Sequence, residues 1–238
     1  MTLKSLIVPV IAIVLGLCQP ALAEETLTLA TYSGKYNLFT LTAERKLTRD
    51  DQGLYSYQQE SKSFLGSILE KSQFRLSNDN RLIPHHYLYR FNILGKNKVY
   101  EIAFDWQKNE ALYSKNGNSQ VIPIQPGVFD PLSYQLQLQR DLLKGKTELH
   151  YPVLKRGKLK EYRFEKIASE TIPFKGAESD TIKLKKEPSS QKRNTVIWLS
   201  PDDLYQIAQL EHTEKGQTNR LSLESTEITP EFRTWLSQ

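Results

Sequence analysis

Histidine and serine are the residue types in this 238-residue sequence that most directly suggest chemistry, and their spacing argues against it. His85 and His86 are adjacent, so on a β-strand their rings would point to opposite faces and could not hold one metal ion together. His150 and His212 stand far away in the sequence and form no H-x-H or H-x-x-x-H spacing. The sequence therefore predicts no metal site.

No arrangement typical of a nucleophilic serine is present either. The sequence has no G-x-S-x-G segment, and the S-x-x-K match at residues 189–192 falls in a polar turn without its companion motifs. No glycine-rich phosphate loop is present. Paired carboxylates are placed by the fold, so Glu101, Asp105 and Glu110 keep a glycan-acting hydrolase open as an alternative. We predict no catalytic residue, no cofactor and no enzymatic activity.

The first 23 residues have the organisation of a cleaved secretory signal peptide. Lys4 supplies the positive charge, residues 6–17 are apolar, and Ala21 and Ala23 occupy the small-residue positions before the cleavage site. The apolar run is shorter than the roughly 20 residues that span a bilayer. Cys18, the one cysteine, follows Leu17 where a lipoprotein needs a small residue, so lipidation is not favoured. We therefore expect a periplasmic chain of residues 24–238 with no disulfide and no transmembrane segment.

Alternation of apolar and polar residues is the main structural signal in the mature chain. Tyr100, Ile102, Phe104 and Trp106 share one parity, which is typical of a strand with one buried face. Residues 149–153 and 182–184 repeat the pattern, and pairs such as Asn116-Gly117 mark tight turns between the runs. No linker divides the chain. These features predict a mainly β fold in one domain, an antiparallel meander that forms a curved sheet or open barrel.

One segment has helical spacing instead. Asp130 suits the N-cap and Pro131 the first helical position, and Ser133 would then bond a backbone donor in the first turn. Leu132, Leu136 and Leu143 follow with helical spacing, with Leu138 and Leu142 beside them, up to Gly145. We predict a helix at about 130–144 packed on the sheet, and the same cap chemistry at Thr229-Pro230 predicts a short C-terminal helix.

The positive charge of the sequence is concentrated in one stretch. Residues 155–193 hold twelve Lys and Arg against six Asp and Glu, while the whole chain carries +5. One interpretation is attraction to anionic envelope components such as lipid phosphates or acidic glycans. The other is a set of solvated strands whose lysines prevent edge-to-edge pairing. Nucleic acid is not expected as a partner of an exported protein.

Several scattered segments resemble, in this order, the exported bacterial DUF3108 family, a domain of unknown function. They are residues 70–74 (EKSQF), 81–89, 104–106 (FDW), 130–136 (DPLSYQL), 162–164 and 195–199. The resemblance covers nearly all of residues 24–238 and implies a curved antiparallel sheet with the 130–144 helix against it. It supplies no catalytic residues. Within it, the structural motif residues are Asp105, Asp130, Pro131, Ser133 and Tyr134.

Two classes of function remain. The first is a non-enzymatic cell-envelope protein that binds an amphipathic ligand, such as a lipid, an acyl chain or a glycan, in the curved sheet. The candidate ligand-lining residues are the aromatic side chains Tyr87, Tyr89, Tyr100, Phe104, Trp106 and Trp198, which could equally fill a core. The second is an envelope scaffold or assembly partner that acts through protein–protein contacts. A sizeable apolar cavity between the helix and the sheet would favour the first class, and tight packing there would favour the second.

Overall fold

The computed structural model describes residues 24–36, 39–174, 176–190 and 192–237. The predicted signal peptide and Cys18 lie outside these residues. Among the described residues, no helix is long and apolar enough to span a bilayer.

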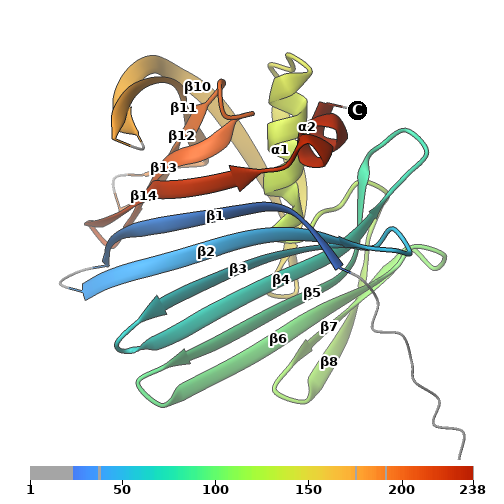
Figure 1. Cartoon of the computed structure of the whole chain (residues 1–238). Helices are drawn as coiled ribbons and strands as arrows, with labels where there is room; N and C mark the ends of the chain where they lie inside the picture. The colour runs from blue at the N-terminus through green and yellow to red at the C-terminus, as the bar shows by residue number, and fades with distance from the viewer. Residues whose placement is uncertain (1–23, 37–38, 175, 191, 238) are drawn as a thin grey trace, which may run out of the picture.

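The described chain forms one antiparallel sheet of fourteen strands and two short helices (Figure 1). The strands are β1 Glu24–Tyr36, β2 Phe39–Asp50, β3 Tyr55–Ser63, β4 Gly66–Leu76, β5 Leu82–Ile93, β6 Lys96–Asp105, β7 Glu110–Lys115, β8 Asn118–Pro123, β9 Leu149–Lys155, β10 Lys158–Phe174, β11 Ala177–Glu187, β12 Arg193–Ser200, β13 Gln206–Glu214 and β14 Gln217–Ile228. The helices are α1 Ser133–Leu143 and α2 Pro230–Ser237. The predicted antiparallel meander and both predicted helices are confirmed.

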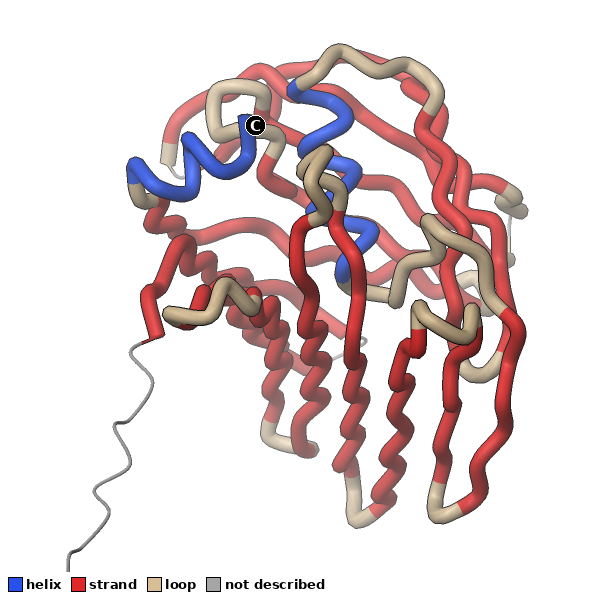
Figure 2. Tube along the Cα trace, turned by 90° about the vertical axis from the view of Figure 1, so that its right-hand side faces the viewer, coloured by secondary structure: helices blue, strands red, loops and turns tan. Residues whose placement is uncertain are grey.

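The order of strands places the first and last strands, β1 and β14, side by side in the middle of the sheet. Strands pair with their sequence neighbours, and β1 pairs with β14, so the free edges are β8 and β9. The sheet curls around α1, which lies in the hollow (Figure 2). We call the side of the sheet that faces α1 the concave face and the other side the convex face.

The two free edges approach each other without forming a ladder. Phe129, in the connection between β8 and α1, makes a single parallel bridge to Val153 of β9. Farther along, the β9–β10 turn packs on β7, because a Cβ atom at Gly157 would lie 2.9 Å from the ring of Tyr113. Gly157 also has a φ of +72°, which a side chain would disfavour. The architecture is therefore an open barrel whose gap is bridged by two backbone hydrogen bonds of Phe129 and by the packing of Gly157 on Tyr113.

Topology gives the barrel two different ends. The turns that follow odd-numbered strands, such as 94–95 between β5 and β6 and 215–216 between β13 and β14, all lie at one end. We call this the hairpin end. Both α1 and α2 start from strands that finish at the opposite end. The concave face is thus covered by helices at one end only (Figure 1).

Alternation along the strands decides which residues the concave face buries. Tyr100, Ile102 and Phe104 are buried, whereas Glu101 and Ala103 between them are exposed. The same parity buries Leu149, Tyr151 and Val153 on β9. The period-two signal in the sequence therefore marks the concave face correctly.

Asp130 anchors the start of α1 to the sheet. Its carboxylate accepts hydrogen bonds from the backbone N–H of Leu132 (2.7 Å) and of Ser133 (2.8 Å), and from the Oγ of Ser72 on β4 (2.6 Å). The Ser133 hydroxyl accepts in return from the Asp130 N–H at 3.1 Å, as the sequence predicted. The helix itself begins at Ser133, not at Asp130, and Leu132 is its N-cap residue. The predicted N-cap assignment was wrong by two residues, because Asp130 first closes a turn over Pro131.

Helix α2 packs beside α1 through its own apolar residues. Phe232, Trp235 and Leu236 are buried, and the Thr229 Oγ1 accepts from the N–H of Phe232 at 3.1 Å, which is the predicted cap. Arg140 of α1 is fully buried against α2. Its Nη1 donates to the backbone oxygen of Trp235 at 3.1 Å and its guanidinium lies 4.9 Å from that ring, but Nε and Nη2 have no partner among the described residues. Burial lowers the Arg140 pKa.

The Asp130 anchor makes a prediction about stability. We expect Asp130→Ala to lower the free energy of unfolding by about 2–4 kcal/mol, because two backbone donors and one hydroxyl lose their acceptor. Asp130→Asn keeps an acceptor oxygen, so its effect should stay within about 1 kcal/mol. Urea unfolding followed by tryptophan fluorescence measures both, and equal losses in the two variants would contradict the capping role.

Asp130→Asn also tests the effect of the charge on the Asp130 carboxylate. Burial raises the Asp130 pKa above its ordinary value of 3.8, so the folded chain holds this proton more tightly than the unfolded chain. This group should therefore reduce stability as the pH rises from about 4 through the raised pKa. Asp130→Asn should lack that contribution, and the difference between its unfolding free energy and that of the wild type should change with pH in this direction.

Arg140 gives a second stability prediction. Replacing this unpaired buried charge with an apolar side chain of similar length, Arg140→Met, should leave the free energy of unfolding unchanged or raise it by up to about 2 kcal/mol. Arg140→Ala should be less stable than Arg140→Met by about 2 kcal/mol or more, because it leaves a cavity. Urea unfolding compares the two. A loss of stability in Arg140→Met would show that the hydrogen bond and ring contact of the guanidinium with Trp235 outweigh the cost of burying its charge.

Candidate functional site

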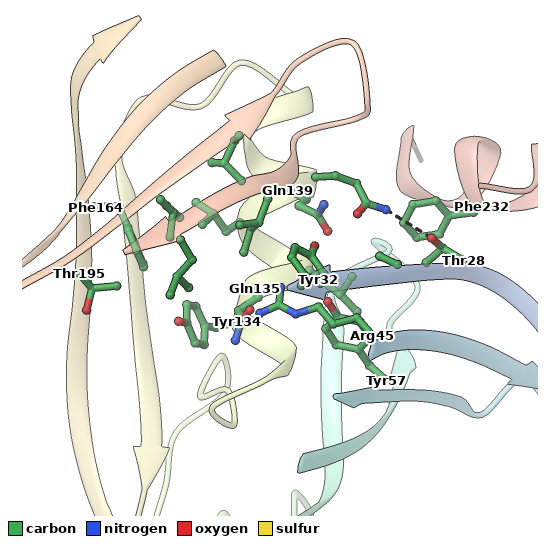
Figure 3. Close-up of a pocket in the computed structure, with 18 residues that line it drawn as sticks. Thr28, Tyr32, Arg45, Tyr57, Tyr134, Gln135, Gln139, Phe164, Thr195 and Phe232 are labelled. Carbon is green, nitrogen blue, oxygen red and sulfur yellow. Dashed lines mark hydrogen bonds between the residues drawn. The ribbon is translucent and has the colours of Figure 1, made fainter. Parts of the chain in front are cut away.

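A small cavity lies between α1 and the concave face, toward the middle of the sheet (Figure 3). Side chains from β1, β2, β3, β10, β12, β13 and both helices line it. Its volume is about 60 Å³, enough for a few water molecules at about 10–15 Å³ each. The helix is therefore packed closely on the sheet but does not fill the space completely.

One wall of the cavity is polar and carries a single charge. Arg45 of β2 projects toward Tyr32, Tyr57 and Gln135 (Figure 3). Its Nε donates to Gln59 Oε1 at 2.7 Å, and its guanidinium lies 5.3 Å from the Tyr32 ring. No ion pair to Arg45 is found in the described chain. The guanidinium therefore presents charge to the cavity without a direct ion pair, and Glu70 attracts it only at longer range.

Tyrosine hydroxyls complete this polar wall. Burial raises the pKa of Tyr32 to about 12, and burial likewise raises the pKa of Tyr134, which α1 contributes. Both side chains are thus neutral near pH 7 and can donate a hydrogen bond. Tyr134 belongs to the motif that the sequence indicated, and the structure places it in the cavity.

The opposite wall is aliphatic. Ile197 and Leu199 of β12 lie beside Ile207 and Leu210 of β13, and α1 adds Leu136. Apolar surface of this kind has no hydrogen bonds to offer and favours hydrocarbon. The cavity as a whole is amphipathic, with one cation on its polar wall and an apolar surface on the opposite wall.

The aromatic residues predicted to line a ligand site lie mostly elsewhere on the concave face. Tyr87 is fully buried, Tyr89 stacks on Tyr100 with ring centroids 4.5 Å apart, and Phe104 stacks on Trp106 at 5.5 Å. These side chains come from β5 and β6 and the turn after β6, and none of them lines the cavity. They pack chiefly on one another.

Trp198 faces the convex side instead. Its neighbours in β12, Ile197 and Leu199, line the cavity, so its own side chain points the other way. The indole N–H donates to Glu170, and the Lys183 ammonium lies 4.6 Å from the ring centroid. Trp198 therefore belongs to a surface cluster on the outside of the barrel.

The other polar candidates have local partners. The Asp105 carboxylate accepts from the N–H groups of Gln107 and Lys108, both at 3.1 Å, and closes the β6–β7 turn. Glu101 lies 3.5 Å from the Nε2 of His86 on the convex face. Among the described residues, no three or more His, Cys, Asp or Glu gather as metal ligands would.

Sequence reasoning missed Arg45 and Glu70, the two charges that strand parity places on the concave face near α1. Glu70 of β4 accepts from the hydroxyl of Tyr87 and pairs in register with Gln59, which in turn binds Arg45. A signal was present in the sequence. Arg45 shares its parity with Ala43 and Leu47, so it is a charge at an inward position of an alternating strand.

Comparison with known proteins supports the fold and the family. A β-barrel-like protein of another domain of unknown function, DUF1849 from Brucella abortus, aligns with a TM-score of 0.56 at 7% identity over 88% of this chain and 100% of that chain. A porin-like protein from Bacteroides uniformis aligns with a TM-score of only 0.25 at 8% identity, over 85% of this chain and 96% of that one. The first likeness shows a shared β-barrel-like fold, and the second is too low to carry an argument.

Sequence comparison is more specific. No functionally curated protein matches the chain. The model of the family described as "Protein of unknown function (DUF3108)" matches residues 31–218. This match spans the sheet from β1 into β14 and includes α1 and all the cavity-lining residues except Thr28, Ala30 and Phe232. The protein therefore belongs to the DUF3108 family, as the ordered segments of its sequence predicted.

Proposed function

We propose that this protein is an exported, non-enzymatic binding protein of the bacterial cell envelope that holds an amphipathic ligand on the concave face of its sheet. The observation that carries the proposal is the amphipathic cavity beside α1. A guanidinium inside a fold that has a neutral hydrogen-bond partner but no direct ion pair is costly unless a further acceptor binds it. Arg45 and the neighbouring tyrosine hydroxyls would bind an acceptor oxygen, such as that of a carboxylate or an ester.

The aliphatic wall defines the other half of the ligand. A hydrocarbon segment placed against Ile197, Leu199 and Leu210 would bury apolar area on the side of the cavity that faces Arg45. The cavity volume limits what enters without rearrangement. A chain terminus or a small head group fits the present space. For a longer chain, either α1 must move away from the sheet or the rest of the ligand must occupy the hairpin end of the hollow.

Movement of α1 away from the sheet would not require the strands to separate. α1 is held at its first residues by Asp130, and beyond Leu143 it leads into residues 144–148, which are all exposed and outside any strand. The second half of the helix is also held, because Gln139 donates to the Tyr205 carbonyl, Arg140 to the Trp235 carbonyl, and the Tyr151 hydroxyl to Asp141. A pivot of α1 would break these bonds but would not break the sheet. Ladder hydrogen bonds between strands would be unchanged by that motion.

Binding of a model amphiphile tests the proposal. We expect laurate to bind the purified protein, and Arg45→Met to weaken that binding by about 10-fold, because a charge-assisted hydrogen bond is lost. Dodecyltrimethylammonium, with the same chain and the opposite charge, should bind more weakly than laurate. Isothermal titration calorimetry measures all three.

A matched control separates the site from general charge. Arg220 of β14 is also an arginine on a strand, but it pairs with Glu211 on an exposed surface. Arg220→Met should leave laurate binding unchanged, whereas Leu210→Trp, which fills the cavity, should reduce it. Native mass spectrometry of protein recovered from a bacterial periplasm gives an independent readout. A consistently ligand-free protein that also fails to bind laurate would overturn the proposal.

A second candidate function rests on the free edge of the sheet. Leu112 of β7 and Val121 of β8 are cross-strand partners on the convex face, and they are 44% and 54% exposed. An exposed apolar pair beside an unpaired edge strand suits contact with another protein. This favours the scaffold alternative. A photocrosslinker at Val121 in intact cells should then capture one dominant partner that the same group at Thr218 of β14 does not.

A further inference from the structure

Four cations converge on the concave face between the cavity and the hairpin end. Lys155 of β9, Lys160 of β10, Lys186 of β11 and Arg193 of β12 come from adjacent strands. We call them the concave cation cluster. Strand parity places them on the concave face, since each shares its parity with a buried or cavity-lining residue. These residues are Val153, Tyr162, Leu184 and Thr195 respectively.

The concave cation cluster has no acidic partners of its own. Among the described residues, none of the four cations forms an ion pair. The lysines of β11 that face the convex side behave differently, because Lys183 lies 3.1 Å from Glu170 and Lys185 lies 3.1 Å from Glu187. Within the basic stretch, Lys183 and Lys185 on the outside are therefore neutralised, whereas the concave cation cluster on the inside has no ion pairs among the described residues.

The cations of the cluster are partly desolvated and repel one another. Burial, followed by repulsion from Lys155 and Arg193, lowers the pKa of Lys186 to about 7. Burial also lowers the pKa of Lys155, which Glu70 attracts and which Arg156, Lys160 and Arg193 repel. Two acids lie nearby, Glu70 across the hollow and Glu214 opposite Arg193 in the ladder. Neither is close enough to form an ion pair with the cluster.

We propose that the concave cation cluster binds a phosphate group, and that this phosphate is the head of the amphipathic ligand. A phosphate carries more than one negative charge and several acceptor oxygens, so it can bind lysines on different strands together with the guanidinium of Arg193. A single carboxylate would leave most of the cluster unneutralised. As an assignment of the head group, this inference rests on the proposed function. As an anion site, it is tested separately below.

The geometry connects the cluster to the cavity. Thr195 lines the cavity on the same strand and face as Arg193, and its Oγ1 lies 2.8 Å from the Nδ1 of His212. Lys186 belongs to the neighbouring strand and lies over the ring of Tyr162. A ligand with its phosphate at the cluster would therefore direct its apolar part along Thr195 toward Ile197 and Leu199. Arg45 would then be placed near the linkage between head and chain.

Two matched ligands and one free anion test the assignment. We expect monolauroylglycerol phosphate to bind about 30-fold more tightly than monolauroylglycerol, because only the former places a phosphate on the cluster. Lys186→Gln combined with Arg193→Gln should reduce that ratio to about 3-fold or less. Inorganic pyrophosphate alone should bind weakly and compete with the phosphorylated lipid. Calorimetry at a fixed, stated salt concentration measures each case.

The control variant is Lys183→Gln combined with Lys185→Gln, which removes two charges from the convex face of the same strand. It should keep the full phosphate effect. An equal loss in both double variants, or a phosphate effect below about 3-fold in the wild type, would overturn the inference. Circular dichroism checks that each variant is folded, and Lys186→Met alone provides a second variant that removes charge without leaving a cavity.

The outcomes also separate this inference from the proposed function. If both lauroyl compounds bind equally and the cluster variant has no effect, the protein binds an amphiphile but the phosphate assignment is wrong. If pyrophosphate binds in a cluster-dependent manner and neither lauroyl compound binds more tightly than pyrophosphate, the anion is a free phosphate. In that case the cluster remains a phosphate site, and the amphipathic ligand is overturned.

Discussion

The anchoring of one short helix inside a long curved sheet is the constraint on which the rest of the structure depends. Fourteen antiparallel strands create a concave face that must be covered, and α1, with eleven residues, covers only part of it. Asp130 decides which part, because its carboxylate joins the first turn of the helix to Ser72 of β4. Beneath α1 the sheet is largely buried around the small amphipathic cavity. Beyond the helix the same strands carry tyrosines and charges.

This division explains why charges occur on an inward-facing surface. An uncovered concave face remains in contact with water, so Glu70 and the concave cation cluster can be accommodated there at lower cost than in a closed core. The balance of sign is uneven, since the cations outnumber the acids and lack ion pairs. Strands that needed lysine only to block edge pairing would carry it outward, as Lys183 and Lys185 do. Inward lysines need another explanation, and an anionic ligand supplies one.

Much of the fold could be predicted from the sequence, because strand alternation and turn residues are local signals. Tyr100 and Ile102 marked an inward face, Asn116-Gly117 marked a turn, and Asp130 with Pro131 marked the approach to a helix. The pairing of β1 with β14 could not be predicted, since it joins segments almost 200 residues apart. The site was predicted less well. The large aromatic residues were predicted to line the site, but they mostly pack on one another. Arg45 is a single charge, and its role depends on the residues across the hollow.

The open barrel also has consequences for how a ligand could reach the site. Closed barrels maintain their circumference by continuous backbone hydrogen bonds, and opening them breaks a ladder. Here the gap between β8 and β9 is bridged by Phe129 at one level and by the contact of Gly157 with Tyr113 at another. Contacts of these kinds can separate with little loss of strand pairing. Because the β9–β10 turn follows Lys155 directly, movement of that turn would widen the hollow beside the concave cation cluster, where the proposed head group binds.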